Sequence, residues 1–98
     1  MELLGRHVAR MVAAIERDRG ASPVLRAVVL EFQCKVEKNR AALQGTDNVR
    51  EAVVEVEQAA DSARVAARAD AGAADDTKKL IETAHDAFCL FKFEQAKV

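Results

Sequence analysis

The chain has 98 residues, half of them hydrophobic and 32% charged, and its net charge is -1. This composition excludes a disordered chain, and the length favours a single domain over residues 1–98. The near-neutral charge argues against a general affinity for nucleic acid or for an anionic membrane. No apolar run approaches the ~18 residues that a membrane span requires.

The N-terminal segment and the cysteines bear on the cellular compartment. Arg6 and Arg10 interrupt the apolar residues near the N-terminus, so this segment lacks the shape of a signal peptide. The two cysteines, Cys34 and Cys89, lie far apart and do not form the framework typical of small secreted proteins. We therefore expect a cytoplasmic protein with free thiols.

Residues that favour helices dominate the chain, and clusters of turn residues divide it. In the stretch GASP, residues 20–23, Gly suits the position after a helix end, Ser suits an N-cap and Pro suits the first helical position. The stretch GTDN, residues 45–48, ends one helix and caps the next, and Asn48 with Glu51 has the spacing of a capping box.

A third division lies at Gly72, which Asp75 and Asp76 follow as candidate caps. The three divisions predict helices at residues 2–19, 23–44, 47–71 and 75–96. Short connections suit antiparallel neighbours, so we expect an all-α fold, a four-helix up-down-up-down bundle. A single glycine among alanines can also lie inside a helix. In that case the last two helices merge and the alternative is an intertwined helical dimer.

The first two predicted helices each carry an apolar stripe at helical spacing. Its members are Leu4, Val8, Met11, Val12 and Ile15 in the first helix, and Leu25, Val28, Val29, Phe32, Val36 and Leu43 in the second. The second helix is also apolar on its opposite side, at Ala27, Leu30, Cys34 and Ala41. A helix with two apolar sides is typical of the centre of a larger assembly. We therefore assign Ala27, Leu30 and Cys34 to an interface.

The last predicted helix faces a third helix whose inner side is mostly alanine. Its inward stripe comprises Leu80, Ile81, Ala84, Phe88 and Phe91. We expect Phe88 and Phe91 to fill the space opposite the alanines. Cys89, Leu90 and Phe93 point about 120–180° away from that stripe at 100° per residue. They form the second part of the expected interface.

Glu82-x-x-His85 has the spacing used in di-iron bundles, where a second copy of the chain would have to supply a second pair. Cys89 lies one turn after His85, and His7 and Cys34 complete the ligand types of a zinc site. Helical geometry, however, turns Glu82 about 160° from the inward stripe. We favour a solvated Glu82 beside a boundary histidine, and we expect neither a metal nor another cofactor.

Arg6, Arg10 and Arg17 share one polar side of the first helix, where a partner's carboxylates or a phosphate could bind. A solvated helix face is the commoner explanation of such a row. No serine lies in a Gly-x-Ser-x-Gly setting, and no glycine-rich phosphate loop is present. The sequence therefore gives no catalytic residues.

These patterns predict a small helical module that binds proteins, itself included as a homodimer, through an exposed apolar surface. Adaptor, chaperone-like and antitoxin-like roles all fit this description. One alternative is a metal-binding or di-iron bundle assembled across a dimer. Another is a protein that holds a small apolar ligand between the alanine face and the phenylalanines.

Overall fold

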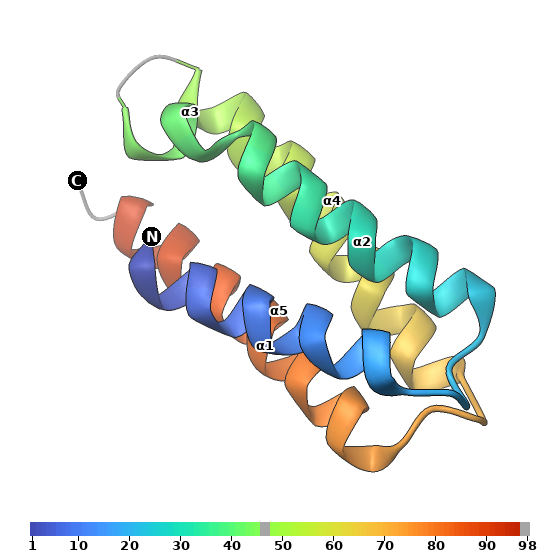
Figure 1. The fold of residues 1–98 in the computed structure, drawn as a ribbon. Helices are drawn as coiled ribbons and strands as arrows, with labels where there is room; N and C mark the ends of the chain where they lie inside the picture. Colours follow the sequence, from blue (N-terminus) through green and yellow to red (C-terminus); the bar gives the residue numbers. More distant parts are fainter. Residues whose placement is uncertain (46–47, 97–98) are drawn as a thin grey trace.

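A computed structural model describes residues 1–45 and 48–96, and these residues form five α-helices (Figure 1). The helices are α1 (Glu2–Arg17), α2 (Pro23–Lys38), α3 (Arg40–Gln44), α4 (Val49–Ala69) and α5 (Asp75–Ala96). The all-helical prediction is therefore confirmed. No helix within the described part of the chain combines the length and the hydropathy needed to cross a membrane.

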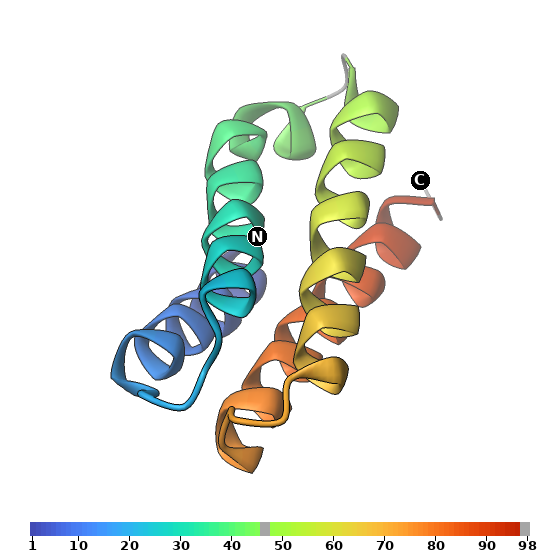
Figure 2. The ribbon, with the colours of Figure 1, turned by 90° about the vertical axis from the view of Figure 1, so that its right-hand side faces the viewer.

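The four long helices lie side by side around one core (Figures 1 and 2). The helix α1 packs against α5 and α2, and α4 packs against α2 and α5. The helices α2 and α5 therefore lie diagonally across the core, and their outer sides face in different directions. This arrangement decides which exposed residues can belong to the same surface.

The second predicted helix, at residues 23–44, is wrong as a single element because Asn39 interrupts it between α2 and α3. The side-chain amide of Asn39 donates to the carbonyl oxygen of Lys35 at 2.9 Å and to Glu55 Oε2 at 3.0 Å. Such side-chain bonds compete with helical backbone pairing. The beginning of this helix is as predicted, because Ser22 Oγ accepts a hydrogen bond from the amide of Leu25 at 3.1 Å.

The capping box predicted for Asn48 and Glu51 does not form. Asn48 adopts a left-handed conformation with φ of 63°, and its side chain makes no capping hydrogen bond. The other candidate caps, Thr46 and Asp47, lie outside the described residues. At the third division, the segment around Gly72 separates α4 from α5. The merged helix on which the intertwined dimer depended is therefore absent.

The loop between α1 and α2 closely resembles the loop between α4 and α5. Corresponding residues lie 52 positions apart: Asp18 and Asp70, Gly20 and Gly72, Ala21 and Ala73. In each loop the aspartate accepts a hydrogen bond from the glycine two residues later, at 3.0 Å and 2.9 Å. We call α1 and α2 the N-terminal hairpin, and α4 and α5 the C-terminal hairpin.

Each loop aspartate also binds the opposite loop. Asp70 Oδ2 accepts from the amide of Ser22 at 3.0 Å, and Asp18 Oδ2 accepts from the amide of Ala74 at 2.8 Å. Ala74 immediately precedes α5, so the carboxylate at the start of this helix comes from the other hairpin. The expected caps Asp75 and Asp76 are instead the first residues of α5. The reciprocal bonds relate the two hairpins by an approximate two-fold axis.

The core residues show the same correspondence between the two hairpins. Buried residues of the N-terminal hairpin recur 52 positions later as buried residues of the C-terminal hairpin: Leu4 and Val56, Val8 and Ala60, Met11 and Ala63, Ile15 and Ala67, Val29 and Ile81, Phe32 and Ala84, Val36 and Phe88. In most pairs the larger side chain belongs to the N-terminal hairpin. The alanine face of α4 is thus complemented by the large side chains of α1 and α2 as well as by α5.

Two core assignments in α5 need correction. Leu80 is only partly buried and lines an open hollow at the surface. Phe88 is fully buried as predicted, whereas Phe91 is only half-buried. The two rings stack with their centroids 6.3 Å apart, and Phe91 lies beside Met1 and Leu4 at the beginning of α1. Phe91 therefore covers the end of the core and does not fill the space opposite the alanines.

Candidate functional site

The first candidate surface is the outer side of α2, formed by Val24, Ala27, Leu30 and Cys34 and called here the α2 surface. All four residues are exposed, and 47% of Leu30 is accessible. Buried residues of α2 lie on the other side of the helix. The structure therefore places Ala27, Leu30 and Cys34 together, away from the core of the chain.

The C-terminal hairpin provides an internal comparison for the α2 surface. The positions equivalent to Ala27, Leu30 and Cys34 are Lys79, Glu82 and Asp86 of α5. The same helix position in the same fold is therefore charged in one hairpin and apolar in the other. Folding of a hairpin does not require apolar residues at these positions, so their presence on α2 has another cause.

The second candidate surface is the end of α5, formed by Cys89, Leu90 and Phe93 and called here the α5 surface. Leu90 is 51% exposed and Phe93 is 58% exposed. Their equivalents in α2 and α3 are Glu37, Lys38 and Ala41, which are mostly charged. Because α2 and α5 are diagonal neighbours, the α2 and α5 surfaces are separate and do not form one continuous interface.

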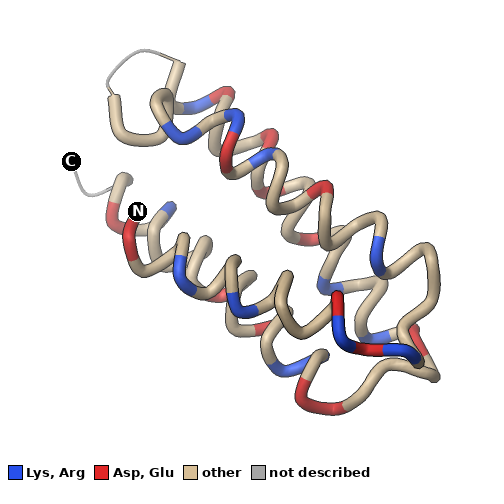
Figure 3. Tube along the Cα trace, in the orientation of Figure 1, with Lys and Arg blue, Asp and Glu red and all other residues tan. Residues whose placement is uncertain are grey.

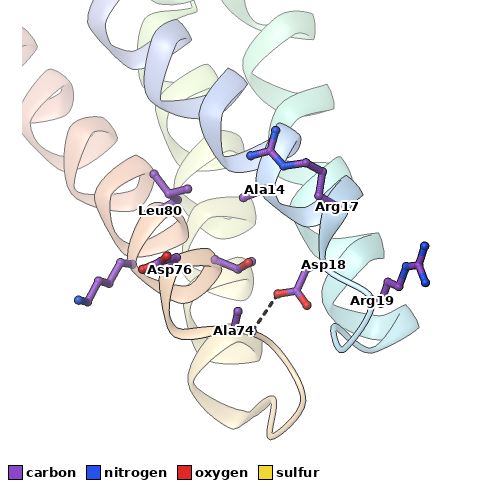
Figure 4. Close-up of a pocket in the computed structure, with 9 residues that line it drawn as sticks. Ala14, Arg17, Asp18, Arg19, Ala74, Asp76 and Leu80 are labelled. Atoms are coloured by element: carbon purple, nitrogen blue, oxygen red, sulfur yellow. Dashed lines mark hydrogen bonds between the residues drawn. The ribbon is translucent and has the colours of Figure 1, made fainter.

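A groove between α1 and α5 is the third candidate, and sequence patterns alone did not reveal it. At one end, Leu3, Ala87, Leu90 and Phe91 line a small apolar hollow of about 90 Å³. At the other end, an open hollow of about 670 Å³ lies among Arg17, Asp18, Arg19, Lys79 and Leu80 (Figure 4). The two hollows are separate and lie at opposite ends of the same pair of helices, and we call them, together with the exposed stretch of α1 between them, the α1–α5 groove.

Asp18 in the larger hollow is fully engaged by the protein itself. The Thr77 hydroxyl and then the Ala74 amide bind its carboxylate, and these hydrogen bonds lower its pKa below the ordinary value of 3.8. Figure 4 shows Asp18 turned toward Ala74 and the side chains of Arg17 and Arg19 extending away from it. Besides Asp18, the charged groups that line this end of the groove are thus Arg17 and Arg19 on the α1 side and Asp76 and Lys79 on α5.

Basic residues recur along α1 (Figure 3). Arg6, Arg10 and Arg17 share one side of the helix, as predicted, and all are exposed. None of the ion pairs formed among residues 1–45 and 48–96 involves these three guanidinium groups. Their equivalents on α4 are Gln58, Ser62 and Ala69, so the arginine row also occurs in one hairpin only.

His85 is the one predicted metal-ligand candidate that is buried, with 5% of its surface exposed. Its Nε2 lies 2.8 Å from Asp61 Oδ1 on α4, and its Nδ1 lies 3.2 Å from Asp86 Oδ1. Both ring nitrogens therefore face carboxylates. Asp61 is a partner that spacing within α5 could not reveal, because it comes from another helix.

Cys89 lies next to His85, with its Sγ 3.8 Å from Nδ1 and 3.9 Å from Nε2. Partial burial raises the pKa of the Cys89 thiol above its ordinary value of 9.0. Asp86, Asp61 and Glu57 raise it further, against the opposing effect of Lys92. A raised pKa keeps the sulfur protonated, whereas nucleophilic attack and metal binding require the thiolate. This surrounding does not suit a catalytic cysteine.

Glu82 does not form a common site with His85 and Cys89. Its carboxylate accepts a hydrogen bond from Arg68 Nε on α4 at 2.6 Å. Across the described residues, no group of three or more His, Cys, Asp or Glu side chains is arranged to hold a metal ion. The Glu82 and His85 pair instead contributes to polar contacts between α4 and α5, together with the ion pair of Glu57 and Lys92.

Comparison with known proteins adds no relative: no family model, no curated protein and no solved structure matches the chain.

Proposed function

We propose that this protein is a small interaction module, a four-helix up-down-up-down bundle that binds other proteins and a second copy of itself. The observation that carries the proposal is the apolar α2 surface, whose equivalent positions on α5 are charged. Exposed contiguous apolar residues mark protein-binding surfaces more often than they stabilise a fold. Free Cys34 and Cys89 fit a reducing compartment such as the cytoplasm.

The α2 surface is the proposed homodimer interface, with Leu30 at its centre and Ala27 and Cys34 on either side. Two-fold dimers bury the same patch of both copies, so one helix side can provide the whole contact. The α5 surface, with Cys89, Leu90 and Phe93, is the proposed contact for a different protein. An adaptor, a chaperone-like protein or an antitoxin would each use such a pair of separate surfaces.

Light scattering on the purified protein over a range of concentrations tests the homodimer. Leu30→Glu is the informative variant, because the equivalent position on α5 is Glu82 and the hairpin accepts a glutamate there. Burial of a leucine side chain contributes about 1.5–3 kcal/mol, so we expect dimerisation to weaken by tenfold or more. Val65→Glu on the exposed side of α4 is the control and should leave the molar mass unchanged.

Alkylation of Cys34 gives a second readout of the same interface. Cys34 is exposed in the single chain, so it should react readily in dilute solution and become protected as the dimer forms. A wild-type protein that stays monomeric at high concentration, with Cys34 equally reactive throughout, would contradict the proposed dimer.

A further inference from the structure

We infer that the α1–α5 groove binds an acidic amphipathic helix from another protein, an inference that rests on the proposed interaction function and specifies its partner. The groove joins two kinds of recognition group along one line. Apolar side chains, including Leu3, Leu90 and Phe91, line the hollow at one end, and Arg17 lines the hollow at the other end. Arg6 and Arg10 are exposed on the stretch of α1 between the two hollows.

The charges of the groove select an acidic partner. Arg6, Arg10 and Arg17 form no ion pair with the described residues of this chain, although the molecule as a whole carries a net charge of -1. The opposite edge of the groove, on α5, carries Asp76 and Glu94 at its two ends. Lys79 also lines the larger hollow from α5, so it is the row of three arginines without ion pairs, and not the charge of the α5 edge, that favours a partner with carboxylates beside α1.

The spacing of the arginines indicates a helical ligand. The helix α1 has 16 residues, which corresponds to a length of about 24 Å. A partner helix of similar length would meet Arg6, Arg10 and Arg17 with acidic residues spaced four and seven positions apart. Residues at such spacings share one helix face, and its apolar neighbours can then enter the hollow at Leu3 and Phe91.

A protein fits this surface better than a nucleic acid does. Proteins that bind single-stranded nucleic acids interleave basic residues with aromatic rings that stack on bases. No aromatic residue occurs in α1, and the apolar end of the groove offers a hollow of only about 90 Å³, with Phe91 as its single aromatic side chain. The equivalent groove between α2 and α4 has Gln58 and Ser62 in place of arginines, so the fold itself does not demand the basic row.

A fluorescent peptide of about 16 residues serves as the probe, with leucines along one helix face and glutamates spaced four and seven positions apart beside them. Fluorescence anisotropy measures its binding to the whole protein at low and high salt. A peptide of the same composition in scrambled order, a peptide with lysine in place of glutamate and a single-stranded oligonucleotide are measured alongside. We expect binding of the first peptide alone, weakened by salt.

Two triple variants with the same change in net charge separate the groove from general electrostatics. Replacing Arg6, Arg10 and Arg17 by glutamine should weaken binding about tenfold, since each exposed ion pair contributes a factor of roughly two to five. Replacing Lys38, Arg50 and Arg68 by glutamine removes three positive charges from other helices and should change the affinity less than twofold. Circular dichroism establishes that both variants keep the helical fold.

The inference is wrong if the designed peptide does not bind at about 1 mM, if the scrambled peptide binds equally well, or if both triple variants behave alike. Tighter binding of the oligonucleotide than of the peptide would also overturn it. Leu30→Glu separates the test of peptide binding from the test of the homodimer, because the α2 surface lies away from the groove. A monomeric Leu30→Glu protein should retain peptide affinity, so either proposal can fail while the other stands.

Discussion

Gly20 and Gly72 face each other across the two hairpin loops so closely that a Cβ atom on either residue would overlap the carbonyl oxygen of the other. Neither glycine has a positive φ, so the close approach of the two backbones, and not backbone conformation, requires glycine here. The contact lies between the reciprocal bonds of Asp18 and Asp70, where the two hairpins are joined.

Gly20→Ala should therefore destabilise the protein by about 1–3 kcal/mol, because the loops must separate to admit the methyl group. Gly5→Ala serves as the control, for which we expect the opposite change in stability. Gly5 lies within α1, and its nearest neighbour, Arg40 Nη2, would be 3.8 Å from an added Cβ. Alanine there should stabilise the protein by about 0.5–1 kcal/mol. Urea unfolding of both variants provides the comparison, and equal effects of the same sign would contradict the loop contact.

Acid should weaken the junction between the hairpins through Asp70. The Ser22 hydroxyl and amide, followed by the amides of Ala73 and Gly72, lower the pKa of Asp70 from 3.8 to about 2. A carboxyl group whose pKa is depressed by folding stabilises the native state above its unfolded pKa. This contribution should be complete above about pH 4 and should disappear as the pH falls through 2.

The measurement is the free energy of unfolding between pH 7 and pH 2 for the wild type and Asp70→Asn. The variant should be less stable at neutral pH and should lose less stability on acidification. Glu55 also has a pKa lowered to about 2, chiefly by Lys35, then by Lys38 and Asn39, so part of the acid sensitivity should remain. Identical pH profiles for the two proteins would show that Asp70 does not contribute.

Periodicity predicted the core stripes well because burial follows the 3.6-residue repeat of a helix. It did not predict the break at Asn39, since the Glu55 carboxylate that binds this side chain comes from α4. The buried state of His85 was missed for the same reason, because its partner Asp61 lies 24 residues earlier. Spacing within one helix identifies its faces, whereas a groove such as that between α1 and α5 depends on how helices are placed.

Cys89 should be less reactive than its exposure suggests. Burial and the carboxylates of Asp86, Asp61 and Glu57 raise the pKa of its thiol above 9.0, and the rate of alkylation follows the thiolate fraction. In native protein at pH 8, Cys89 should therefore be alkylated by iodoacetamide several-fold more slowly than in protein unfolded by guanidinium chloride. Mass spectrometry of the labelled peptides checks this, and equal native and unfolded rates would contradict the assigned surroundings.

The two stacked phenylalanines of α5 should differ in their contribution to stability, although the sequence places both on the inward face. Phe88 is fully buried, so Phe88→Ala removes apolar contacts and leaves a cavity, at a cost of about 3–5 kcal/mol. That is a large part of the ~5–15 kcal/mol available to a domain of this kind. Phe91 is half-buried at the edge of the core, so Phe91→Ala should cost about 1–2 kcal/mol.

Phe91 also borders the α1–α5 groove, whereas Phe88 is absent from its lining. Phe91→Ala should thus weaken binding of the acidic peptide although it destabilises the fold less than Phe88→Ala does. Urea unfolding at several protein concentrations separates a loss of core packing, which lowers the free energy of unfolding at every concentration, from a change in self-association, whose effect depends on concentration. If Phe91→Ala destabilises the protein as severely as Phe88→Ala at every concentration, Phe91 lies in the core and the last turns of α5 pack differently. Because Phe91 stacks on Phe88, a double variant should cost less than the sum of the two single losses.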